Sequence, residues 1–336
     1  KLINAGNIQN SGIEIALNTT PIKKKQWQWD LNFTYTRNRN KIVELSPDVT
    51  SYINLDGAAN YGNYRIASVA KVGSDYGMLM SDSWIKTDEK TGKPVVGYTN
   101  KFRTVYYKRG GTVKEVGSML PNFLGSLNST LRWKDLSLYV LFDARFGGYV
   151  ASYNSRYATA YGFSGETEKY RKGMTWTSKY ANAQDKVFTD GFIPDVVFDA
   201  GTIVTTPGGT NQDVSGMTYQ EAYEKGYVEP AHLQSAAYFK NSWGTGVIND
   251  DWFKKINYIA LREITLSYNV PTKISSYIGA KNLSLSFTGR NLAYLLNTAP
   301  NHENPESVRG TGAAQFRMRS FMPYTASYLF TLNATF

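Results

Sequence analysis

The sequence of 336 residues contains no cysteine, so it has neither a disulfide framework nor a metal site built from thiolates. Its two histidines, His232 and His302, have no second ligand at a metal-binding spacing. Glycine pairs such as Gly208-Gly209 lack the lysine and the strand-to-helix context of a phosphate-binding loop. Without an acid, base, nucleophile or metal in a recognisable arrangement, the sequence predicts a protein that is not an enzyme and that needs no cofactor.

Long apolar runs are also missing, and no stretch approaches the roughly 18 consecutive apolar residues of a membrane-spanning helix. The start of the sequence lacks the basic segment and apolar core of a signal peptide, so we expect any such signal to have been removed or to lie upstream. Charged residues make up only 19%, and the net charge of +10 is scattered along the chain. Because no recognition helix or zinc-finger spacing accompanies this charge, we expect no nucleic-acid partner.

Aromatic residues are abundant, at 14% of the chain, and polarity alternates over long stretches. In residues 324–336 one row of alternate residues is wholly apolar or aromatic, and only Leu329 interrupts the polar row. This period of two predicts a strand with one apolar and one polar face. It exceeds the usual strand of about five or six residues and suffices to cross a bilayer, which takes roughly nine to eleven. A long edge strand of a soluble sandwich is the alternative interpretation.

Six other segments alternate in the same way, so the sequence predicts seven strands. The six are residues 12–18, 27–36, 122–133, 136–146, 263–270 and 283–290. Residues 65–72 and 77–85 are two further candidates. In residues 27–36, Trp27 and Trp29 lie at one end of the apolar row, which is typical of an aromatic girdle at a membrane interface.

The connections between these strands alternate between short and long. Residues 19–26, 134–135 and 271–281 form the short ones, and residues 46–121, 147–260 and 291–323 form the long ones. Outer-membrane barrels have short periplasmic turns and long extracellular loops, whereas a soluble sandwich has no reason to alternate. We therefore predict an all-β fold: a transmembrane antiparallel β-barrel segment with the C-terminus in the periplasm and the long loops outside the cell.

Two groups of side chains are candidates for ligand contact. Aromatic residues of the long loops offer flat faces to sugars or peptide side chains, and an alternative role for each is packing within the loops. They are Tyr153, Tyr157, Tyr161, Trp176 and Trp243. The first three have a spacing of four residues, which aligns them on a short helix. Arginines of the polar rows would give the barrel interior a basic lining, namely Arg132, Arg145 and Arg290.

Several motifs follow one another along nearly the whole chain. They are N-x-G-x-x-x-N-x-G-x-E at residues 4–14, the strand of residues 29–45, the spacing of Gly117, Pro121 and Gly125, L-R-x-x-x-L-x-Y-x-x-P at residues 261–271, Asn291-Leu292 with Asn304-Pro305-Glu306, and the ending with Pro323, Tyr328 and Phe336. In this order they resemble the C-terminal third of SusC/RagA-type TonB-dependent outer-membrane transporters of Bacteroidota. The sequence departs from that pattern at Ala326, where the family commonly has arginine, and at Asn304, where it has aspartate. It also lacks an Asp/Gly-rich stretch before Pro121, so no calcium site is expected.

The resemblance implies that residues 1–336 are the C-terminal part of a barrel of about 22 strands in the outer membrane, in contact with its lipid and lipopolysaccharide. Such a barrel imports oligosaccharides or oligopeptides. A SusD-like surface lipoprotein covers it as a lid, and the TonB complex engages a plug domain that this sequence does not contain. The ending with Tyr328, Phe330 and Phe336 resembles the signal that the barrel assembly machinery recognises. A barrel for adhesion or anchoring without transport, and a soluble all-β glycan-binding module, are the alternatives.

Overall fold

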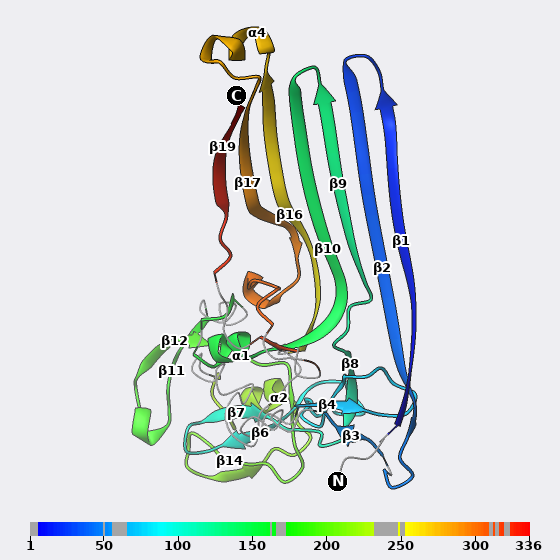
Figure 1. Cartoon of the computed structure of the whole chain (residues 1–336). Helices are drawn as coiled ribbons and strands as arrows, with labels where there is room; N and C mark the ends of the chain where they lie inside the picture. The colour runs from blue at the N-terminus through cyan, green and yellow to red at the C-terminus, as the bar shows by residue number, and fades with distance from the viewer. Residues whose placement is uncertain are drawn as a thin grey trace.

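A single long antiparallel sheet dominates the fold. The computed structural model describes residues 6–49, 51–55, 66–161, 163–165, 173–231, 248, 253–308, 312, 316–318 and 323–336. The sheet contains β1 (Gly6–Lys23), β2 (Trp27–Leu45), β9 (Phe123–Trp133), β10 (Leu136–Ser152), β16 (Phe253–Val270), β17 (Asn282–Asn297) and β19 (Ser327–Thr335), which lie side by side in this order. Figure 1 shows these strands standing together, with the short turns at one end and the other elements gathered at the opposite end.

All seven predicted strands are present, and most of them are longer than their alternating patterns indicated. Each neighbouring pair is antiparallel, and the residues that alternate in sequence share one face across the sheet. The apolar face is open, with Leu17 56%, Phe287 52% and Phe330 73% exposed. An antiparallel sheet with one apolar and one polar face matches the wall of a membrane β-barrel.

Aromatic rings border the apolar face at both ends. The rings of Trp27 and Trp133 stack at 5.6 Å beside the short turns. At the other end Phe123 stacks on Tyr35 at 5.3 Å and on Phe146 at 4.8 Å. The eleven residues of β9 join the two groups. At about 3.4 Å per residue and a tilt near 40°, they are separated by about 25 Å along the barrel axis, the height of a lipid-facing band.

The long connections fold into small sheets and helices. β3 (Ile53–Asn54), β4 (Ile66–Ala70), β5 (Met78–Ser81) and β8 (Lys114–Ser118) form a four-stranded sheet. The two candidate strands at residues 65–72 and 77–85 are therefore β4 and β5, which belong to this sheet and not to the barrel wall. β11 (Met174–Thr177) pairs with β12 (Val187–Gly191), and β14 (Ile203–Thr205) pairs with β15 (Asn211–Asp213). Among the described residues, no helix has both the length and the apolar character needed to cross a membrane.

One apolar core joins two connections that are far apart in the sequence. β6 (Val95–Thr99) pairs with β7 (Thr104–Tyr107) and with β13 (Val197–Phe198), and α2 (Tyr219–Glu224) packs against them. Val96 and Val105 come from the first long connection, whereas Phe198 and Tyr219 come from the second, and all four are buried. We call this unit the two-loop core.

Where β10 and β16 extend beyond the aromatic border, both of their faces are covered. On one side Ala151 and Phe253 pack with Leu79 of β5 and Met119. On the other side Val150 and Ile256 pack with Ala299 and with Met318 of β18 (Arg317–Met318), which pairs with the end of β10. The segment that follows β17 is thereby held against the polar side of the wall.

Candidate functional site

The polar face of the wall is an array of side chains that bond to one another. Arg132 of β9 forms an ion pair with Asp30 of β2, and the hydroxyls of Thr34 and Ser126 lie 2.6 Å apart. Further along the sheet, Arg290 Nε donates to Glu263 Oε2 at 2.9 Å. Because the apolar face looks outward in a barrel, this array would line the interior.

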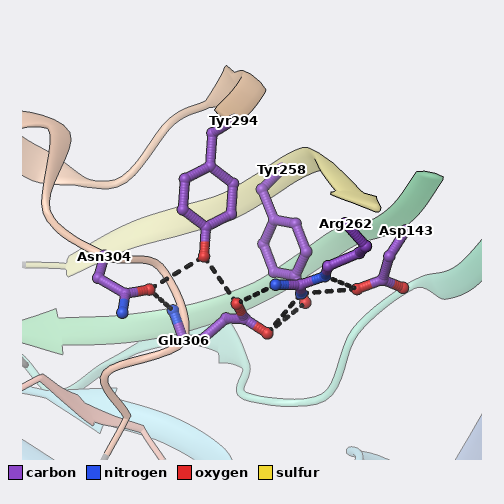
Figure 2. A network of polar contacts seen from close by, with 6 residues as sticks. All are labelled: Asp143, Tyr258, Arg262, Tyr294, Asn304 and Glu306. Carbon is purple, nitrogen blue, oxygen red and sulfur yellow. Dashed lines mark hydrogen bonds and ion pairs between the residues drawn. The ribbon is translucent and has the colours of Figure 1, made fainter. Parts of the chain in front are cut away.

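Arg262 is the centre of the largest polar network among the described residues of this face, drawn in Figure 2. It occupies a β-bulge, since Leu141 and Phe142 of β10 pair with Glu263 and Leu261 and leave Arg262 without an opposite residue. A bulge re-aims a side chain, which explains how Arg262 reaches two carboxylates. Its Nη2 donates to Asp143 Oδ2 at 2.8 Å and to Glu306 Oε1 at 2.6 Å, while its Nη1 donates to Glu306 Oε2 at 2.8 Å.

The guanidinium therefore holds Glu306 through two parallel hydrogen bonds, the geometry that makes arginine–carboxylate pairs strong. Burial acts to raise the pKa of Glu306, but the hydrogen bonds from Arg262 and Tyr294 outweigh it and hold the pKa below its ordinary value. Tyr294 Oη lies 2.7 Å from Glu306 Oε2 and 3.0 Å from Asn304 Oδ1, so it donates to one of them at a time. The main-chain N–H of Glu306 donates to Asn304 Oδ1 at 3.1 Å.

A second carboxylate of the same segment has a different environment. Glu303 is 8% exposed and accepts hydrogen bonds from the hydroxyls of Ser152 and Ser155, at 3.2 and 3.3 Å, at the start of α1 (Tyr153–Ala160). Asn154 Nδ2 also donates to it, at 3.4 Å. Burial without an ion-pair partner among the described residues raises the pKa of Glu303. Glu303 thus ties the segment to α1, and Glu306 ties it to the wall.

Together these contacts form what we call the inner strap: residues 298–308, fixed across the polar side of β10, β16 and β17. Apolar packing of Ala299 and Val308 lies beneath the two carboxylate contacts. The arrangement holds no nucleophile with an activating base, and among the described residues no group of three His, Cys, Asp or Glu side chains could hold a metal ion. The inner strap can therefore shape a cavity and hold hydrogen-bond donors and acceptors in fixed positions.

The three tyrosines with a spacing of four residues do lie on or next to a helix, α1, as their spacing predicted. Their environments differ. Tyr153 is 4% exposed and packs in the apolar cluster with Phe253 and Met119. Tyr157 is 36% exposed and Tyr161 is 65% exposed, so these two are the more accessible of the three.

The other aromatic candidates lie elsewhere in the loops. Trp176 is on β11, where it stacks on Phe188 at 5.0 Å and donates from Nε1 to Glu229 at 3.3 Å. Its ring is therefore engaged in loop packing. Trp243 and one of the two histidines, His232, lie outside the described residues.

The candidate arginines of the barrel interior already have partners. Arg132 and Arg290 form the ion pairs described above, and Arg145 donates to the main-chain oxygens of Met119 and Gly147, each at 3.3 Å. At the end of the chain, Tyr328 and Phe330 of β19 are exposed on the apolar face, and Phe336 is 72% exposed next to it.

Residues from two separate sequence motifs contact each other at the inner strap, and the sequence alone did not reveal this contact. Arg262 belongs to the L-R-x-x-x-L-x-Y-x-x-P motif, and Asn304 and Glu306 belong to the segment after Asn291-Leu292. None of the five residues Arg262, Asn304, Glu306, Glu303 and Asp143 was predicted as a site residue. The only available signal for Asp143 was a charged residue on the inward row of a barrel strand, which barrels commonly tolerate.

Comparison with known proteins supports these motifs, although no protein-family model matches the chain. The chain is 23% identical over 299 residues to the TonB-dependent receptor P26 of Formosa agariphila, covering 87% of this chain and 25% of the receptor. The chain thus spans about a quarter of the length of this curated relative.

Solved structures of RagAB match the fold over nearly the whole chain. The RagAB peptide transporter gives a TM-score of 0.57 at 15% identity, covering 99% of this chain and 30% of that one. The RagAB peptide importer gives 0.54 at 14% identity in its closed-closed state, over 99% and 30% of the two chains. Its open-open state gives 0.55 at 12% identity, over 98% and 29%. The expected resemblance to SusC/RagA-type TonB-dependent transporters and the fold of a β-barrel segment are confirmed.

Proposed function

We propose that this chain forms the C-terminal part of the barrel wall of an active importer in the outer membrane. The observation that carries the proposal is the long antiparallel sheet, with an apolar outer face and an inner face whose polar side chains hydrogen-bond to one another. This sheet has the fold of a RagAB segment over 99% of the chain. In the proposed importer, energy comes through TonB and a plug domain outside this sequence. The substrates are oligopeptides or oligosaccharides, because the matched solved structures are of a peptide importer and the loops are rich in aromatic residues.

We place the short turns, with α4, in the periplasm, and the small sheets with α1 and α2 outside the cell. The unequal connection lengths support this direction, since barrel loops are long on the extracellular side. A SusD-like lipoprotein would then lie over the end that carries α1 and the two-loop core. This partner is proposed for the present chain because its motifs resemble those of SusC/RagA-type transporters and because solved RagAB structures match its fold.

Within this scheme, the inner strap and the exposed rings next to it form one side of the ligand cavity. Tyr157 and Tyr161 are the aromatic residues best placed to contact a ligand, because they are exposed on and directly after the helix that Glu303 ties to the strap. Tyr153 and Trp176 would act by holding the loops in shape. Trp243 remains a proposed ligand contact from its sequence position alone.

The test uses the full-length protein expressed in its native type of cell, with a matched strain that lacks TonB. We expect the protein to fractionate with the outer membrane, to migrate faster in detergent gels before heating than after it, and to co-purify with a lipoprotein. Uptake of labelled oligopeptides or oligosaccharides should require both the protein and TonB. A correctly inserted barrel whose deletion leaves uptake unchanged would favour the adhesion or anchoring alternative. Recovery only in the soluble fraction would refute the barrel.

A further inference from the structure

The short turns form one edge of the sheet, and this edge is strongly basic. The three connections comprise residues 24–26, 134–135 and 271–281, and together with Lys23 at the end of β1 they contain six basic residues and one acidic residue, Asp135. The six are Lys23, Lys24, Lys25, Lys134, Lys273 and Lys281, and all are exposed. We call this edge, with its six lysines, the lysine edge.

The turns are joined to one another, so their charges form a continuous row. The main-chain N–H of Lys134 donates to the oxygen of Gln26 at 3.0 Å, which links the first turn to the second. The N–H of Asn269 donates to the oxygen of Asp135 at 2.9 Å, which links the second turn to the strand that leads into the third. Six neighbouring strands at about 4.8 Å spacing make this row about 25 Å wide.

The lysines of this edge have few internal partners. Lys281 donates to the main-chain oxygen of Phe336 at 3.2 Å, and Lys134 lies 5.2 Å from the centre of the Trp133 ring. Among the described residues, Lys23, Lys24, Lys25 and Lys273 form no ion pair. At the opposite end of the sheet, Lys71, Lys86 and Lys93 are each paired with a carboxylate within 2.7 Å, while Lys90, Lys179, Lys186 and Lys225 form no ion pair among the described residues. The positive charge of the lysine edge is therefore available to an external anion.

Two apolar features place the lysine edge at a membrane surface. The stacked Trp27 and Trp133 mark the border of the apolar face immediately beside the first two turns. In the third connection, α4 (Thr272–Ser275) and the turn after it expose Ile274 at 55%, Tyr277 at 85% and Ile278 at 58%. Large apolar side chains flanked by lysines are the pattern of a segment that lies in the interface between lipid and water. Figure 1 shows this connection projecting beyond the strand ends.

We propose that the lysine edge binds the anionic headgroups of phospholipids in the leaflet that meets the short turns. The ammonium groups would contact the phosphates, while Tyr277, Ile278 and the two tryptophans contact the glycerol region and the upper acyl chains. Each lysine near an anionic surface strengthens binding by about fivefold, so four lysines acting on a few bound lipids produce a measurable preference for an anionic headgroup. The inference rests on the membrane position proposed above.

The test compares the full-length protein with two variants of equal charge change. One carries K23Q, K24Q, K25Q and K134Q in the lysine edge. The control carries K90Q, K179Q, K186Q and K225Q, four exposed lysines in the loops at the other end. Each protein is incubated in mixed micelles with equal amounts of phosphatidylglycerol and phosphatidylethanolamine, freed of excess lipid by gel filtration, and its bound lipids are quantified by mass spectrometry. Faster gel migration before heating verifies that each barrel is folded.

We expect the parent and the loop control to retain phosphatidylglycerol in excess. We expect the ratio of the two lipids to fall about threefold or more in the lysine-edge variant. About 0.5 M salt should lower the parent's ratio to the same level, because it shortens the screening length to a few ångströms. If the first variant does not fold, K134Q with K273Q provides the same comparison with two charges.

Two results would overturn the inference while leaving the proposed function intact. One is an equal lipid ratio in the parent and the folded lysine-edge variant. The other is an equal loss in the loop control, which would assign the preference to net charge and not to this edge. A protein that takes up neither lipid and cannot be reconstituted into bilayers contradicts the membrane position itself, and with it both proposals.

Discussion

Replacement of Arg262 by glutamine should release the inner strap while leaving the barrel wall intact. The change removes the two hydrogen bonds to Glu306 and leaves that carboxylate, together with Asp143, without an ion-pair partner among the described residues. The Arg262 side chain is 19% exposed, whereas those of Asp143 and Glu306 are 36% and 39% exposed. The pair is thus intermediate between a surface ion pair and a buried one.

The expected cost follows from this intermediate burial. Exposed ion pairs contribute about 0–1 kcal/mol, and breaking a buried pair costs about 3–5 kcal/mol. Hydrogen bonds to charged groups contribute about 1.5–3 kcal/mol, and partial exposure of the carboxylates reduces that figure. We therefore expect a loss of about 1–3 kcal/mol in the free energy that holds residues 298–308 in place. Local opening would become about 5 to 150 times more frequent.

Hydrogen exchange of the full-length protein, followed by mass spectrometry, measures this opening directly. Peptides that contain residues 298–308 should exchange faster in R262Q and in E306Q, and the double variant should add little, because both changes break the same contact. Arg290→Gln is the matched control: it breaks the pair with Glu263 within the wall and does not touch the strap. If R262Q alters the hydrogen-exchange rate of the strap by less than about twofold, or if the effects of the two changes are additive, the ion pair of Arg262 with Glu306 is not what holds residues 298–308.

Three further predictions concern other parts of the chain. Because burial raises the pKa of Glu303, the protonated side chain is the form favoured in its site. The contribution of Glu303 to holding the strap should therefore be fully present below the ordinary pKa of 4.5 and be lost as pH rises through the raised pKa. E303Q should remove this pH dependence from hydrogen exchange of the strap. Replacing Tyr157 or Tyr161 by alanine should weaken ligand binding by about two- to tenfold in calorimetry with the full-length protein, and unchanged affinity in both would remove α1 from the ligand cavity. Phe336→Ala should lower the yield of heat-modifiable, assembled barrel, and normal assembly would show that the terminal ring is not a recognition signal.

The strands were predictable where the two faces of the wall meet different surroundings. Lipid on one side and a polar interior on the other impose a period of two, and residues 27–36 and 136–146 display it clearly. Beyond the aromatic border the surroundings change. Both faces of β16 around Phe253 and Ile256 meet protein, so apolar residues occupy both rows and the alternation disappears. In residues 37–45 both rows are largely polar, so the alternation did not indicate the second half of β2, which was expected only from the motif resemblance over residues 29–45.

The inner strap could be predicted only in part. Arg262, Asn304 and Glu306 stand out in motifs, but their contact joins residues 44 positions apart, and Arg262 reaches Asp143 across 119 positions. No local pattern encodes such a distance. The bulge that aims Arg262 is also invisible in sequence, because it arises from the register of β16 against both of its neighbours.

The two-loop core has a consequence for how this protein can be altered. Val96 and Val105 supply one half of its packing and Phe198 and Tyr219 the other, so neither long connection has a complete interior without its companion. An exchange of surface loops between related proteins, for example to transfer a recognition property, would have to move both connections as one cassette. A graft of residues 46–121 alone would leave the apolar side chains of segment 192–231 exposed to water. The hybrid should therefore aggregate before it reaches the membrane.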